Sequence, residues 1–324
     1  MGSKSNASSV NVCQLLPAIF RVFSVFRGET CEKMLFPSDF LTRLEYLSII
    51  SKRVFRGQLL AQRRTVQMGS GIEFSDHREY TYGDDLRYLD WNIYARHGDL
   101  LLKRFQEEQD LHVYLMLDCS RSMAFGNPPK FDLARHLVAA LAYIALADLD
   151  RIAIIAYANG VVAELPVTRG KARILPIMKF LENLDTTGDD THLEKAVQGL
   201  LHRGARTGLA VVVSDLFDEH GFQRGLDQFR YRRFDAHVIQ LHDPKEADPA
   251  LLGDAELIDI ETESVRKVTV TERNLKMYKQ LFADHQIAVR DYCHTYNLGC
   301  TQSPSVIRFD DLIMRMMRES GAGR

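Results

Sequence analysis

The sequence predicts an α/β protein built around a doubly wound, mostly parallel β-sheet. From residue 111 onward, short apolar segments of strand length alternate with longer segments of helix length, as strand–helix–strand units do. Four short segments are apolar over most of their length, which is typical of strands buried on both faces. They are LHVYLMLD (111–118), RIAIIAYA (151–158), LAVVVSD (209–215) and DAHVIQLH (235–242). In such a sheet, ligands bind beyond the carboxyl ends of the strands.

The chain before this sheet divides into two parts. Residues 1–35 begin with a polar run rich in Ser and Asn, and we predict a poorly ordered segment. Pro37 favours a helix start, and apolar residues then recur at helical spacing from Phe40 to Ile50. The segment from Gly69 to Arg104 is rich in Gly, Asp, Tyr and Arg without a clear period, which predicts a small subdomain of extended structure and turns. The predicted organisation is therefore 1–35, 36–110 and 111–324.

The remaining elements of the α/β region follow from the same patterns. Segment 161–167 is expected to pair as an edge strand limited by Pro166, because proline cannot donate to a ladder. A hairpin is expected over 256–261 and 266–270, and a short extended piece over 299–304. Helices are expected at 130–149, 171–184, 191–202, 219–230, 272–296 and 308–319.

Composition narrows the class of protein. With 46% hydrophobic residues among 324, the chain can bury a sizeable core, and its formal net charge of −2 favours neither nucleic acid nor an anionic membrane. No apolar stretch approaches the roughly 18 residues that would indicate a membrane span. The five cysteines follow no zinc-ligand spacing and make no disulfide framework, so a cytoplasmic location is expected.

Oxygen-bearing side chains follow two of the predicted strands and precede one helix. Asp118, Ser120 and Ser122 stand at alternate positions after the first strand, Thr191 opens a later helix, and Asp215 ends the strand LAVVVSD. These loops belong at the same edge of a parallel sheet, so the side chains are expected to converge. An all-oxygen site selects Mg²⁺, Mn²⁺ or Ca²⁺ over softer metals, and Mg²⁺ is the first expectation.

This spacing resembles the metal-ion-dependent adhesion site of von Willebrand factor type A domains, over about residues 111–245. The resemblance implies that Ser120, Ser122 and Thr191 contact the metal and that Asp118 and Asp215 act largely through bound water. It also implies a position left open for an acidic residue of a partner protein. The chain is then expected to be a binding module and not an enzyme.

A second resemblance extends toward the N-terminus. Gly69-Ser-Gly71-Ile-Glu73-Phe74, Arg78-Glu-Tyr80, Gly83-Asp84-Asp85-Leu-Arg87, Asp90-Trp91 and Ala95-Arg96 run directly into the first strand. This signature is similar to that of the bacterial family called domain of unknown function fifty-eight, which joins it to a type A domain. Members are often encoded beside MoxR-type AAA+ ATPases, so the resemblance implies an adaptor for such an ATPase in a chaperone or assembly role.

Two other classes of function stay open. A metal-assisted hydrolase could use the same site with Asp189, Asp190 or Asp218 as general base. A nucleic-acid-associated protein could use the basic runs Arg53–Arg64 and Arg230–Arg233. The sequence contains no phosphate-binding loop, no H-E-x-x-H and no G-x-S-x-G, which counts against catalysis.

Plain structural roles are also possible for the same residues. Asp118 and Ser120 could merely satisfy backbone groups of their loop. Trp91 is expected to be a packing anchor, although the role of the signature from Gly83 to Trp91 stays open. Salt bridges are expected between the acidic residues Asp84, Asp85 and Asp90 and the basic residues Arg78, Arg87 and Arg96.

Overall fold

A computed structural model of the chain describes eight stretches: residues 35–37, 39–55, 64–67, 73–108, 111–187, 190–249, 253–258 and 265–322. Contacts group them into two units, one of residues 49–111 and one of 1–48 with 112–324. The first part of helix α2 (Phe40–Phe55) therefore belongs with the large unit. The domain limits expected at 35/36 and 110/111 stay predictions, as does the character of residues 1–34, which lie outside the described residues.

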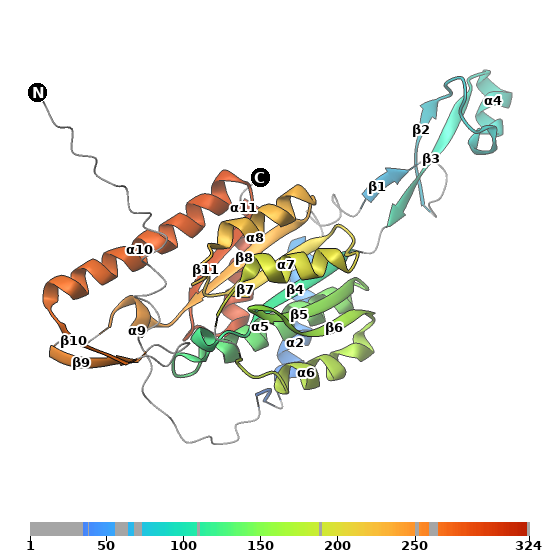
Figure 1. Ribbon diagram of the computed structural model, residues 1–324. Helices are drawn as coiled ribbons and strands as arrows, with labels where there is room; N and C mark the ends of the chain where they lie inside the picture. Colours follow the sequence, from blue (N-terminus) through green and yellow to red (C-terminus); the bar gives the residue numbers. More distant parts are fainter. Residues whose placement is uncertain are drawn as a thin grey trace, which may run out of the picture. The chain divides into compact units, whose positions relative to one another are not determined.

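The large unit is built on a six-stranded sheet with the order β11-β8-β7-β4-β5-β6 (Figure 1). Five strands are parallel to their neighbours, and β6 pairs antiparallel with β5. Their bounds are β4 (His112–Asp118), β5 (Arg151–Ala158), β6 (Gly160–Arg169), β7 (Leu209–Ser214), β8 (Asp235–His242) and β11 (Gly299–Pro304). The predicted fold class, an α/β protein with a mostly parallel sheet, is confirmed.

Helices cover both faces of this sheet (Figure 1). Side chains of α7 (Leu193–His202), α8 (Phe222–Tyr231) and α10 (Glu272–Thr295) share one apolar cluster with β4, β5, β7 and β8. α5 (Lys130–Ala147), α6 (Ile174–Glu182) and α11 (Phe309–Ala322) lie on the opposite side. There Phe40 of α2 stacks near both His136 and Phe309, which ties α2 to this layer.

The register of the sheet brings four strand ends together, those of β4, β5, β7 and β8. Leu117 in β4 is paired with Val213 in β7, and Asp118 is paired with Tyr157 in β5. Ser214 at the end of β7 is paired in turn with Gln240 in β8. Because parallel neighbours end at the same edge, the loops after β4, β5, β7 and β8 meet there.

Pro166 lies inside β6 and does not end it, contrary to the expectation from sequence. β6 continues to Arg169, and its pairing with β5 is irregular around Pro166: Leu165 is opposite Ile154, and Thr168 is opposite Ile152. The strand tolerates the proline because β6 is an edge strand and the irregularity removes the need for a donor.

The remaining short elements connect these strands and helices. The turns η3 (Arg121–Ala124) and η4 (Lys171–Arg173) precede α5 and α6, and α9 (Pro244–Ala247) follows β8. The predicted hairpin is present as β9 (Gly253–Ile258) and β10 (Val265–Val270).

The small unit contains an antiparallel sheet, as its composition predicted, together with a helix that was not expected. The strands are β1 (Arg64–Gln67), β2 (Glu73–Glu79) and β3 (Leu101–Glu108), in the order β1-β3-β2, with the turn η2 (Leu86–Tyr88) between β2 and β3. α4 (Trp91–His97) begins where the Asp90 carboxylate accepts the N–H groups of Asn92 and Ile93. It ends at Gly98, whose φ of 77° needs a glycine.

The structural salt bridges expected for the three aspartates of this unit are present for Asp84 and Asp85, whereas Asp90 pairs with basic residues that were not expected. Arg78 pairs with Asp84 at 2.7 Å and Arg87 pairs with Asp85 at 2.6 Å. The Asp90 carboxylate lies 3.1 Å from the His77 Nε2 atom and 3.4 Å from the Lys103 Nζ atom, and it also caps α4. Trp91 is 60% exposed and contacts Tyr94 edge-on, so it is not a packing anchor within its unit.

Candidate functional site

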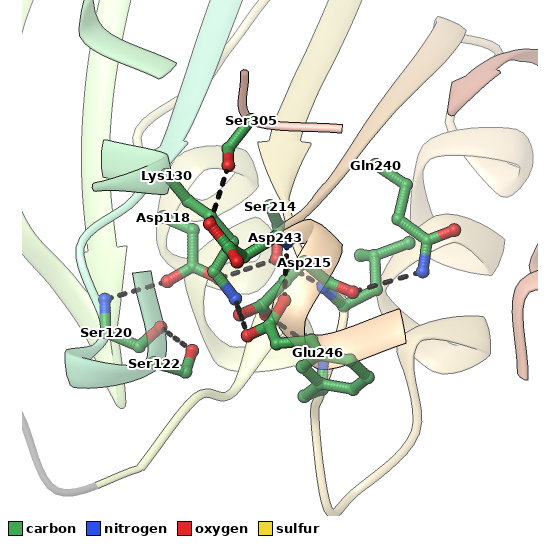
Figure 2. Close-up of polar contacts among 12 residues, drawn as sticks. Asp118, Ser120, Ser122, Lys130, Ser214, Asp215, Gln240, Asp243, Glu246 and Ser305 are labelled. Atoms are coloured by element: carbon green, nitrogen blue, oxygen red, sulfur yellow. Dashed lines mark hydrogen bonds and ion pairs between the residues drawn. The ribbon is translucent and has the colours of Figure 1, made fainter. Parts of the chain in front are cut away.

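Asp118 is the last residue of β4 and is held rigidly by two hydrogen bonds. Its Oδ1 atom accepts the Ser120 N–H at 2.8 Å, and its Oδ2 atom accepts the Ser214 hydroxyl at 2.6 Å (Figure 2). The turn η3 begins after Ser120, and it places the Ser120 hydroxyl 3.0 Å from the Ser122 hydroxyl. Asp118 and Ser120 have no exposed surface, so this edge of the sheet presents a dense set of oxygen atoms.

Thr191 precedes α7 on a loop that is tied to the ends of two strands. His192 N–H donates to the Ala158 carbonyl at the end of β5, at 2.9 Å. Leu193 N–H donates to the Asp218 carboxylate, which follows β7, also at 2.9 Å. The Thr191 hydroxyl is buried and has no hydrogen-bond partner. A buried hydroxyl without a partner costs about 1–3 kcal/mol, so it marks a place where a ligand can bind.

Asp215 follows β7 and contacts a buried lysine. Its Oδ2 atom accepts a hydrogen bond from the Lys130 Nζ atom at 2.8 Å, and its Oδ1 atom accepts the Phe217 N–H at 3.2 Å. The next residue, Leu216, is buried and has a φ of 60°, which is uncommon for a residue other than glycine. Its N–H donates to the Ser214 hydroxyl at 2.8 Å, so Ser214 links this turn to Asp118. Such backbone strain is concentrated at functional sites.

Lys130 begins α5 and also contacts Glu246 of α9. The distance from Nζ to Glu246 Oε1 is 2.6 Å, and the lysine side chain has no exposed surface (Figure 2). Glu246 uses its other oxygen to accept the Asp243 N–H at 2.7 Å, as part of a capping box around α9. Asp243 in turn accepts the Ser305 hydroxyl at 3.0 Å. The network therefore extends from the strand ends to α9 and the segment after β11.

Burial dominates the electrostatics of this network. It raises the pKa of Asp118 to about 7, and the nearby charge of Asp215 adds to the effect, although hydrogen bonds from Ser214 and Ser120 oppose it. Burial by itself lowers the pKa of Lys130, but the carboxylates of Asp215 and Glu246 overcome this and raise it. Burial also raises the pKa of Glu246. The two carboxylates in contact with Lys130 therefore keep the lysine charged, whereas burial favours the neutral form of Asp118.

The donors of this site fit a hard divalent metal ion. They are two carboxylates and three hydroxyls, and Mg²⁺ and Ca²⁺ prefer oxygen ligands of these types. The unpaired Thr191 hydroxyl is a donor that a dication would satisfy. Nowhere in the described stretches do three or more His, Cys, Asp or Glu side chains form a metal-binding group, so any metal here depends on the hydroxyls.

The five residues expected from sequence are thus placed as follows. Asp118, Ser120, Ser122 and Asp215 share one network through Ser214, and Thr191 is positioned beside the same strand ends by its loop. Whether they bind metal remains a prediction.

Several residues around the site were missed by sequence reasoning, namely Lys130, Ser214, Glu246 and Tyr157. The Tyr157 side chain is fully buried, and its pKa is raised by burial and by the charge of Asp118. Only Ser214 carried a signal, since it immediately precedes Asp215 at the end of a strand.

The structure offers little support for the two alternative functions, a hydrolase and a nucleic-acid-associated protein. Both carboxylate oxygens of Asp218 accept backbone N–H groups, from Leu193 and His220, so Asp218 is a structural cap and not a free base. Asp189 lies outside the described residues, and so do the side chains of Arg53–Arg64. Arg230 pairs with Asp227 and lies over the ring of Tyr296, so it contributes to packing. The described helices include none long and apolar enough to cross a membrane.

Comparison with known proteins agrees with the sequence-based resemblance. The model of the family described as "Protein of unknown function DUF58" matches residues 76–288. The uncharacterized proteins Rv1480 of Mycobacterium tuberculosis and Mb1516 of Mycobacterium bovis are each 24% identical to the chain over 258 residues, covering 78% of the chain and 80% of each relative.

Two solved structures illustrate the fold. One is an aerotolerance-related membrane protein from Bacteroides fragilis, with a TM-score of 0.43 and 16% identity, over 65% of this chain and 98% of that chain. The other is the SpRpn10 VWA domain, with a TM-score of 0.37 and 11% identity, over 64% and 95% of the two chains.

Proposed function

We propose that this chain, which belongs to the DUF58 family, is a protein-binding module whose contact with its partner is completed by a divalent metal ion. The observation that carries the proposal is the set of oxygen donors at one edge of the sheet, with the unpaired Thr191 hydroxyl among them. Of the metals that such donors accept, Mg²⁺ is the first choice, and Mn²⁺ and Ca²⁺ are alternatives.

The roles of the individual residues are those that the resemblance to type A domains implies, and the hydrogen bonds are compatible with them. Ser120, Ser122 and Thr191 would hold the metal directly. Asp118 and Asp215 already accept hydrogen bonds at both of their oxygens, so they would act through metal-bound water. A metal held mainly by neutral hydroxyls retains much of its positive charge. It therefore favours an anionic ligand from outside, such as an Asp or Glu of a partner protein.

The partner we propose is a MoxR-type AAA+ ATPase, with the chain as its adaptor in a chaperone or assembly role. This step is supported by the resemblance to a family whose members are often encoded beside such ATPases. The location we propose is the cytoplasm, supported by the five cysteines of the sequence, which make no disulfide framework. A hydrolase at the same site is less favoured, because Asp218 is committed to backbone groups.

The direct test is binding of the purified chain to a MoxR-type ATPase encoded beside it, measured in Mg²⁺ and in EDTA. We expect about a tenfold or greater loss of affinity in EDTA, within the usual range of coupling between two ligands. The variant Ser120→Ala/Ser122→Ala should bind equally weakly in both buffers. Thr168→Ala is the matched control, because it removes a hydroxyl from the far end of the edge strand β6. Equal affinity of wild type in both buffers would remove the metal from the mechanism.

A further inference from the structure

The feature that the proposed function does not use is the buried ammonium of Lys130. It stands at the first residue of α5, fully inside the protein, and its Nζ atom contacts Asp215 at 2.8 Å and Glu246 at 2.6 Å. The ring of Phe217 lies 5.5 Å away and covers another side of the ammonium. Placing a lysine here is costly unless it is paired, so the charge must be balanced by these two carboxylates.

The two carboxylates hold the ammonium unequally. Glu246 is anchored by the capping box of α9, because its second oxygen accepts the Asp243 N–H at 2.7 Å. Asp215 is the residue that the metal would share with Lys130, since its Oδ2 atom accepts the ammonium hydrogen bond. Glu246 therefore shares the ammonium with Asp215, and a metal ion at this site would place a second cation beside the same aspartate.

We propose that Lys130 is an internal cation that competes with the divalent metal for Asp215 and thereby sets the metal affinity of the site, with Glu246 adjusting the strength of the competition. This inference rests on the proposed function, because it concerns the same metal site. Like charges a few ångströms apart in a buried setting repel strongly, so the effect on metal affinity is expected to reach about tenfold or more.

Two variants move the affinity in opposite directions. Lys130→Met/Glu246→Gln removes one positive and one negative charge, so the net charge of the network is unchanged, but Asp215 is released from the ammonium. Its affinity for metal should rise about tenfold. Glu246→Gln removes one of the two carboxylates that contact the Lys130 ammonium, and Asp215 is the other. Its affinity for metal should fall severalfold.

The probe is Mn²⁺ alone, with binding measured by electron paramagnetic resonance and checked by the shift in melting temperature. Circular dichroism confirms that each variant is folded, and Asp118→Ala shows which part of the signal comes from this site. A tighter double variant together with a weaker single variant supports the inference. If the double variant does not fold, Glu246→Gln decides alone, because unchanged or tighter Mn²⁺ binding there overturns the competition.

The results also separate this inference from the proposed function. If wild type and both variants bind Mn²⁺ with equal affinity, the proposed role of Lys130 is overturned, but the metal site itself is supported. Absence of Mn²⁺ binding in wild type and in both folded variants overturns the inference and the metal-dependent function together. Binding that appears only after Lys130 is replaced supports the inference, and shows that the wild-type ammonium excludes the metal.

Discussion

Replacing Asp118 by Asn should stabilise the metal-free protein at pH 8 and leave its stability at pH 3.5 nearly unchanged. Burial and the charge of Asp215 raise the pKa of Asp118 from 3.8 to about 7. The folded state therefore binds a proton more tightly than the unfolded state does. The stability associated with the protonated group is present below pH 3.8 and is lost as the pH rises toward about 7.

The magnitude follows from the size of this shift. A shift of about three pKa units corresponds to roughly 4 kcal/mol, at about 1.36 kcal/mol for each unit. Because Asn must adapt to the hydrogen bond from Ser214 at a cost of about 1 kcal/mol, we expect a net gain of about 3 kcal/mol at pH 8. Asn keeps an acceptor for the Ser120 N–H, so the local fold is expected to persist.

The assay is urea unfolding of wild type and Asp118→Asn at pH 3.5, 5 and 8 in EDTA, repeated at pH 8 in Mg²⁺. In EDTA the gain of the variant should grow from pH 3.5 to pH 8. In Mg²⁺ the order should reverse, because metal binding stabilises only the wild type. A variant that is no more stable than wild type at pH 8 in EDTA, or equally more stable at every pH, would refute the assignment of Asp118 as a strained buried carboxylate.

Three further predictions concern other parts of the molecule. Asp90→Asn should lower the stability of the small unit at neutral pH. The hydrogen bond with His77 lowers the pKa of Asp90 from 3.8 to about 2, although desolvation opposes this. The stability that the Asp90 carboxylate contributes is therefore present above pH 3.8 and is lost as the pH falls through about 2. Amide hydrogen exchange in α4 would measure this, and unchanged protection would contradict it. Gly225→Ala should destabilise the protein by about 1–2 kcal/mol, because the added Cβ atom would lie 2.5 Å from the Leu193 Cγ atom. Gly199→Ala is the control and should change the stability little. Thermal unfolding measures both variants. The purified chain should release no phosphate from ATP or simple phosphate esters in Mg²⁺, and turnover that disappears in Asp118→Ala would favour the hydrolase.

The sequence by itself determined the fold class and most of the elements. Apolar runs such as 151–158 and 235–242 became strands with the same bounds, because strands buried on both faces leave an unambiguous pattern. The alternation of these strands with helices was enough to predict a mostly parallel sheet. It was also enough to place Asp118 and Asp215 at one edge of that sheet, because parallel strands end together.

Tertiary structure alone decided what surrounds these residues. Lys130 and Glu246 are 116 positions apart and approach to 2.6 Å only because α5 and α9 meet beside the end of β7. No local pattern marks a lysine that will be fully buried, since its charge becomes tolerable only when distant carboxylates arrive. Local periodicity predicts elements and edges, whereas the charge balance of a buried site depends on which distant side chains the fold brings into contact.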